Sequence, residues 1–166
     1  MIRRISMTLA VLTIASLAFA GDHQHAAAPA SPSFDKMKSL VGDWKAEIPG
    51  MGAATATYSL HSDGGALVEE LKMHGENMVS VYYPTTDGVA MTHYCSGHNQ
   101  PHMVSTGAGQ NVSFAEVSVD NLPSKDAEHM KAVDFAFKDK DHFTATWTHT
   151  AGGKDAPVPF NFVRMK

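Results

Sequence analysis

The segment Val89–Met103, with the sequence V-A-M-T-H-Y-C-S-G-H-N-Q-P-H-M, opens on an alternation of side chains that decides the fold. Successive side chains of a β-strand point to opposite faces of its sheet. A strand over the first seven residues therefore places Val89, Met91, His93 and Cys95 on one face. Apolar, sulfur-containing and ionisable groups on one face are typical either of a pocket lining or of a core with a hydrogen-bonded histidine.

The same pattern of short strands and tight turns continues in both directions along the chain. Turn sequences such as Asp63-Gly64-Gly65 and Asp87-Gly88 separate segments with strand-like alternation. Strands joined by hairpin-length turns predict an all-β, antiparallel up-and-down sheet of about ten strands. Closure into a barrel removes the exposed edges of such a sheet, so we predict a β-barrel, with a two-sheet sandwich as the alternative. We expect the strands at residues 44–48, 53–61, 66–73, 78–83, 89–95, 103–106, 111–119, 130–137, 142–150 and 158–165.

One short helix is expected before the first strand. Ser33 is a suitable N-cap, and the apolar residues that follow have helical spacing. This helix is expected to close one end of the barrel. Its predicted apolar face consists of Phe34, Met37, Leu40 and Val41.

The N-terminus has the features of a cleaved signal peptide at residues 1–20. Arg3 and Arg4 precede an apolar run, which ends in Ala18-Phe19-Ala20, with small residues at the cleavage positions. The small and Pro-containing segment 21–33 reads as a disordered linker. The sequence therefore predicts a single β-barrel domain at residues 34–166. It also predicts a periplasmic or secreted location, without stable membrane anchoring after cleavage.

Charge and cysteine content narrow the classes of partner. Residues 1–20 carry two arginines and no acidic residue, so their removal changes the formal net charge from −4 to −6. An acidic chain without a Lys/Arg block is not expected to bind nucleic acid. Cys95 is the single cysteine, so no intrachain disulfide is possible, and the core alone must stabilise the fold.

Several short motifs carry a resemblance to a known group of proteins. Gly42-Asp43-Trp44 before a β-meander resembles the start of lipocalin and fatty-acid-binding (calycin-like) barrels. Over residues 34–166 the chain looks more similar to an uncharacterised bacterial family of secreted lipocalin-like proteins. This resemblance implies a barrel and export, and the family lends no settled reaction. Lipocalins proper end in a helix, whereas this chain ends in a predicted strand. The likeness to the bacterial family rests on Ala66-Leu67-Val68-Glu69, Thr92-His93-Tyr94-Cys95, Asn99-Gln100-Pro101 with Met103, His129-Met130, and Asp141-His142 followed by Trp147.

A small, mainly apolar ligand bound inside the barrel is the function that these features favour. Glu69 lies between Leu67 and Leu71 on its face, and a carboxylate among apolar groups needs a partner or a raised pKa. Methionines 73, 91, 103 and 130 provide adaptable lining. The face with Phe143, Ala145, Trp147 and His149 is expected to be interior, as is the face with Val133, Phe135 and Phe137. The predicted ligand-binding residues are Glu69, Met91, His93, Cys95, Asn99, Gln100 and Trp147.

Two other functions stay open at this level. His93 with Cys95, His98 and His102 could form a metal site, or a pocket histidine such as His93 or His149 could ligate haem. Alternatively, Glu69 and His93 could act as an acid–base pair in a pocket enzyme, provided that their strands approach one another.

Overall fold

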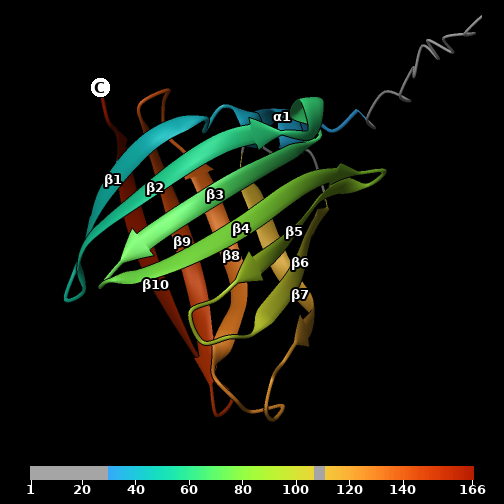
Figure 1. Ribbon diagram of the computed structural model, residues 1–166, viewed down its shortest axis with the longest axis vertical. Coiled ribbons are helices and arrows are strands. Elements are labelled where there is room, and N and C mark those ends of the chain that lie inside the picture. Colours follow the sequence, from blue (N-terminus) through green and yellow to red (C-terminus); the bar gives the residue numbers. More distant parts are fainter. Residues whose placement is uncertain (1–29, 107–110) are drawn as a thin grey trace, which may run out of the picture.

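The computed structural model of the protein describes residues 30–106 and 111–166. Ten antiparallel strands form a closed barrel in which each strand pairs with its neighbours in sequence, and β1 pairs with β10 (Figure 1). The prediction of an all-β up-and-down barrel with one short α-helix is confirmed, and the sandwich alternative is wrong. The elements are α1 (Pro32–Lys38), β1 (Gly42–Ile48), β2 (Gly52–His61), the short 3-10 turn η1 (Ser62–Gly64), β3 (Ala66–Met73), β4 (Glu76–Thr85), β5 (Gly88–Tyr94), β6 (Gln100–Thr106), β7 (Val112–Asp120), β8 (His129–Phe137), β9 (His142–Ala151) and β10 (Lys154–Arg164).

The helix begins earlier than predicted, so the expected N-cap was wrong. Ser31 is the cap, because its Oγ accepts a hydrogen bond from the backbone N–H of Phe34 at 3.2 Å. The same hydroxyl donates to the carbonyl of Gly88 at 2.8 Å, which ties the helix start to β5. Ser33 instead lies inside the helix and is buried. The predicted signal peptide and most of the predicted linker lie outside the described residues.

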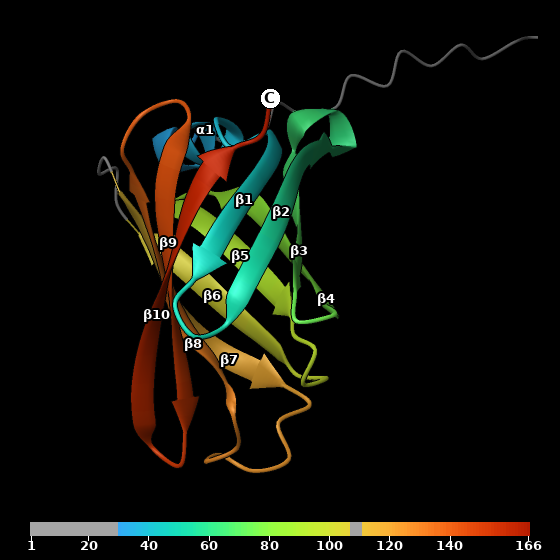
Figure 2. The same cartoon turned by 90° about the vertical axis from the view of Figure 1, so that its left-hand side faces the viewer.

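Helix α1 closes one end of the barrel (Figure 2). Phe34, Met37 and Leu40 are buried there as expected, whereas Val41 is 41 % exposed because the helix has already ended at Lys38. The described part of the chain contains no helix of the length and apolarity that a membrane span requires.

The Gly42-Asp43-Trp44 motif lies at this closed end, where Trp44 and Arg164 contact each other and the backbone of residues 40–41. We call this group of contacts the clasp. The indole N–H of Trp44 donates to the carbonyl of Leu40 at 2.6 Å, and the guanidinium of Arg164 lies 4.0 Å from the centre of the Trp44 ring. Arg164 also donates to the carbonyl of Val41 at 2.7 Å. A Cβ at Gly42 would stand 2.7 Å from the guanidinium, and the φ of +124° there is unfavourable for other residues. Glycine is therefore required where the chain passes the clasp.

Aromatic side chains fill the half of the barrel behind this clasp. Phe143 packs against Trp44 and Phe162 with ring centres 4.7 and 4.9 Å apart. Phe135 and Phe114 continue the same cluster toward β7 and β8. These rings form a continuous aromatic cluster at the end of the barrel that α1 closes.

Strand β10 is longer than predicted and forms part of the opposite end. We expected it to begin at Val158, but it begins at Lys154 and includes Pro157 and Pro159. Strand β1 pairs with β10 only between residues 44–46 and residues 162–164. The first half of β10 therefore has no paired strand on the side that faces β1. A proline, which has no N–H group, costs no sheet hydrogen bond on such an edge. Figure 2 shows the β9–β10 hairpin extending beyond the β1–β2 hairpin at this end.

Candidate functional site

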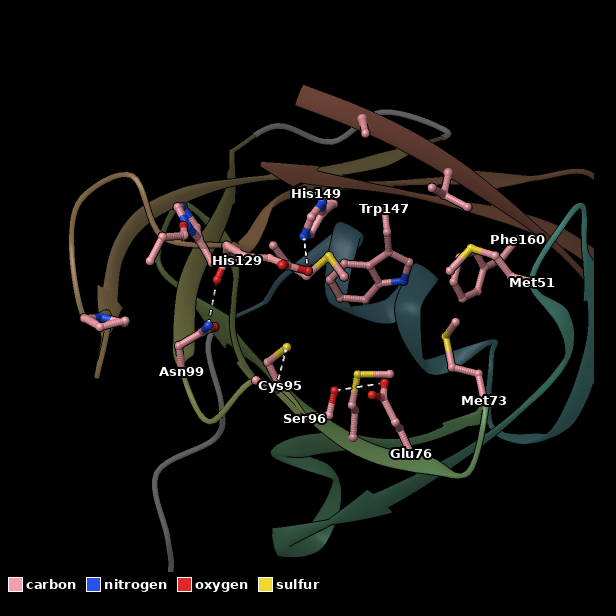
Figure 3. Close-up of a pocket in the computed structure, with 18 residues that line it drawn as sticks. Met51, Met73, Glu76, Cys95, Ser96, Asn99, His129, Trp147, His149 and Phe160 are labelled. Atoms are coloured by element: carbon pink, nitrogen blue, oxygen red, sulfur yellow. Dashed lines mark hydrogen bonds and ion pairs between the residues drawn. The ribbon is translucent and has the colours of Figure 1, made fainter. Parts of the chain in front are cut away.

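A pocket of about 600 Å³ occupies the end of the barrel opposite α1. In an up-and-down barrel every second connection lies at the same end, which brings five turns together here. The β1–β2, β5–β6 and β7–β8 connections contribute lining residues, together with the ends of β3 and β4 that flank their turn and the inner faces of β8, β9 and β10. The pocket shown in Figure 3 is therefore built from segments that are far apart in the sequence.

Thioether and aromatic groups form one part of the wall. Trp147 and Phe160 are 3 % and 4 % exposed, and Met78 is 5 % exposed. Trp147, Phe160, Met51 and Met73 lie on one side of the pocket in Figure 3. Methionine side chains are unbranched and polarisable, so this wall can adapt to an irregular apolar shape.

Polar groups gather on the side formed by the β5–β6 and β7–β8 connections. The Asn99 side-chain N–H donates to the carbonyl of Glu128 at 3.0 Å. His149 Nε2 lies 2.8 Å from Glu128 Oε1, which is within ion-pair distance but outside hydrogen-bond geometry. His129 Nε2 is 2.9 Å from the Glu116 carboxylate. These contacts fix the loop positions around the opening.

Three polar atoms of the wall have no hydrogen-bond partner among the described residues. They are the indole Nε1–H of Trp147, a donor, the Oδ1 of Asn99, an acceptor, and His149 Nε2, which contacts the Glu128 carboxylate only at ion-pair distance. Burial of an unpaired polar group costs about 1–3 kcal/mol. A molecule in the pocket that supplied the missing hydrogen bonds would remove this cost.

A buried carboxylate lies in the barrel interior on β3. Glu69 is 1 % exposed and accepts hydrogen bonds from the hydroxyls of Tyr58 at 2.6 Å and Tyr82 at 2.7 Å. Burial raises the pKa of the Glu69 carboxyl, although hydrogen bonds from Tyr58, Tyr82 and Ser80 oppose that rise. Burial together with the nearby Glu69 charge raises the pKa of each tyrosine well above its ordinary value. The hydrogen-bond partners of the buried Glu69 carboxylate are therefore the hydroxyl groups of Tyr58 and Tyr82.

His93 continues this row of polar groups across the sheet. Glu69 pairs with Ser80 in the β3–β4 ladder, and Ser80 pairs with His93 in the β4–β5 ladder. His93 Nδ1 lies 3.0 Å from Ser80 Oγ, and burial lowers the pKa of the imidazole to about 4. The Ser80 hydroxyl can donate to His93 Nδ1 or accept from it, so this contact is compatible with either tautomer of the imidazole. His93 Nε2 has no hydrogen-bond partner among the described residues.

The structure separates the predicted site residues into two groups. Cys95, Asn99 and Trp147 line the pocket, as do Met73 and Met130. The other predicted ligand-binding residues do not: Glu69, Met91 and His93 are buried deeper in the barrel, as is Met103, and Gln100 is a half-buried rim residue whose Oε1 accepts a hydrogen bond from Asn121. The His93 ring nevertheless lies 4.9 Å from the Trp147 ring, so the deeper group adjoins the pocket wall.

Sequence reasoning missed several lining residues. Met78 and Phe160 alternate with outward-facing residues on β4 and β10, so strand periodicity contained the signal for them. Met51 and Glu128 lie in connections, where no periodicity exists to indicate direction. Only the closure of the barrel brings these turns to the pocket.

The geometry gives little support to the enzyme and metal alternatives. Glu69 and His93 both point inward, but Ser80 stands between them, and neither lines the pocket. Within residues 30–106 and 111–166, no three His, Cys, Asp or Glu side chains gather closely enough to hold a metal ion. His102 bonds to Thr92 and Asp120, on the face of the sheet opposite to His93.

Comparison with known proteins does not extend these findings. No model of a known protein family matches the sequence, and no curated protein is significantly similar to it. The function must therefore be argued from the pocket itself.

Proposed function

We propose that the protein is an exported, lipocalin-like carrier that binds a small, mainly apolar ligand in the pocket at the open end of the barrel. The signal-peptide pattern and the motif resemblance support export and the family, and the pocket supports the binding activity. The ligand is taken up between the β9–β10 hairpin and the connections opposite to α1.

The observation that carries this proposal is the contrast between the two halves of the barrel. One half is packed solid with aromatic rings, whereas the other contains a pocket of about 600 Å³. Small-molecule sites typically occupy about 300–1,000 Å³ and combine apolar walls with a few polar groups. Thioethers, Trp147 and Phe160 provide such walls here, and Asn99 with the Trp147 indole provides the polar groups.

A pocket-filling variant tests the proposal. Val158 lines the pocket from β10, so Val158→Trp places an indole in the space that the ligand needs. We expect the unmodified protein to bind the neutral fluorescent probe N-phenyl-naphthylamine, and the variant to bind it at least about tenfold more weakly, because the apolar contact area is lost. Fluorescence titration measures both affinities.

The matched control lies on the same strand. Val163 is 39 % exposed on the outer face of β10, so Val163→Trp adds the same side chain outside the barrel. Equal probe binding by the Val158→Trp and Val163→Trp variants would contradict the proposed binding site, and so would absence of binding to the unmodified protein. Native mass spectrometry of the purified protein, followed by solvent extraction, identifies a ligand carried from the cell.

A further inference from the structure

The charges around the pocket limit the kind of ligand that it can accept. No lysine or arginine is among the described residues that line the pocket, whereas Glu76 and Glu128 are. The two lining histidines already contact carboxylates, His129 that of Glu116 and His149 that of Glu128. An anionic head group would therefore meet carboxylates at the opening and no free cationic side chain of the lining, which disfavours its burial.

The unpartnered polar atoms indicate what the head group must offer instead. The Trp147 indole N–H needs an acceptor, whereas Asn99 Oδ1 needs a donor. His93 Nε2, whose ring packs against that of Trp147, is a further polar atom without a partner in the described residues. A hydroxyl oxygen can accept from the indole N–H and carries no charge, so an uncharged alcohol or phenol can supply the acceptor that the indole lacks. Neighbouring methionine side chains are flexible enough to move aside for it.

We propose that the pocket selects apolar ligands with an uncharged hydroxyl head group and discriminates against carboxylates of the same shape. This inference rests on the proposed function and goes beyond it, because it distinguishes an alcohol or phenol carrier from a fatty-acid carrier. The Trp147 indole N–H recognises the oxygen of the head group, and Glu76 and Glu128 exclude the anion.

Three ligands of one shape test the selectivity: naphthalene, naphthol and naphthoate. Their affinities are measured by competition with N-phenyl-naphthylamine. We expect naphthol to bind about fivefold more tightly than naphthalene, as one net hydrogen bond allows, and naphthoate to bind most weakly. Naphthoate binding as tight as that of naphthol would overturn the head-group proposal and leave the apolar pocket intact. Failure of all three compounds and of the probe to bind would instead overturn the proposed function.

Two variants and one control variant separate the contribution of the indole from that of the two carboxylates. Trp147→Phe keeps an aromatic ring but removes the N–H donor, so the advantage of naphthol over naphthalene should fall to less than about twofold. Trp44→Phe makes the same change in the closed end of the barrel and should leave that ratio unchanged. The double variant Glu76→Gln with Glu128→Gln should strengthen naphthoate binding several-fold and naphthol binding little. An unchanged naphthol advantage in Trp147→Phe would overturn the role of the indole, and unchanged naphthoate binding in the double variant would overturn the exclusion of the anion.

Discussion

Replacement of Glu69 by alanine is expected to lower the free energy of unfolding by roughly 3–5 kcal/mol. The carboxylate accepts the hydroxyl hydrogens of Tyr58 and Tyr82, and both tyrosines are at most 1 % exposed. Without Glu69 these phenols stay buried, lose their acceptor and face a cavity. Urea denaturation followed by circular dichroism measures the change, as a lower midpoint at an unchanged slope.

The neighbouring residue on the same strand provides the control. Glu70 points to the outer face of β3 and is exposed, so Glu70→Ala should change stability by no more than about 0.5 kcal/mol. Glu69→Gln keeps one acceptor oxygen and the side-chain volume, so its effect should lie between those of the two alanine variants. If Glu69→Ala and Glu70→Ala have similarly small effects, the buried carboxylate does not organise the barrel interior.

The second large effect is a loss of stability in mild acid that depends on His93. Burial lowers the pKa of this imidazole from 6.5 to about 4, so the unfolded chain binds a proton between these pH values that the folded chain does not. Unfolding is therefore favoured as the pH falls. The contribution of His93 is complete above pH 6.5 and decreases by about 3 kcal/mol toward pH 4. The raised pKa of Glu69 acts with the opposite sign, because its stabilising effect is present in acid and is lost as the pH rises through the folded-state value.

Comparison with His93→Gln isolates this contribution. Glutamine does not titrate, so the difference in unfolding free energy between the unmodified protein and the variant should shrink by about 3 kcal/mol from pH 6.5 to pH 4. The His61→Gln variant, at an exposed position of β2, controls for loss of an imidazole elsewhere. A difference between protein and variant that stays constant over this range would refute a buried, neutral His93.

Much of the barrel could be predicted because its determinants are local. The alternation at Val89, Met91 and His93 and the turn at Asp87-Gly88 depend on residues that are adjacent in sequence, and the structure confirms both. The interior positions of Phe135 and Ala145 follow from the same period of two. The prediction failed where local signals compete, as at the helix start, where Ser31 and Ser33 are both acceptable caps and only the hydrogen bond from Ser31 to Gly88 distinguishes them.

The candidate site was less predictable, since burial and pocket lining are different properties. Strand alternation correctly places His93 and Trp147 on inward faces, but it does not say at which height of the barrel packing ends and open space begins. That height depends on the clasp of Trp44 and Arg164 and on the aromatic cluster behind it. Both join residues that are far apart in the sequence, Trp44 to Arg164 in one case and Trp44 to Phe143 in the other.

By itself the sequence determined the number of strands, their antiparallel order and the inward face of most of them, because a β-strand repeats every two residues and its turns are encoded by their own residues. Only the tertiary structure decided that Glu69 is held by two tyrosines, that Ser80 separates it from His93, and that the pocket lies at the end opposite to α1. These contacts form between strands that meet only when the barrel closes. Their partners therefore depend on the register and curvature of the whole sheet, which no single segment specifies.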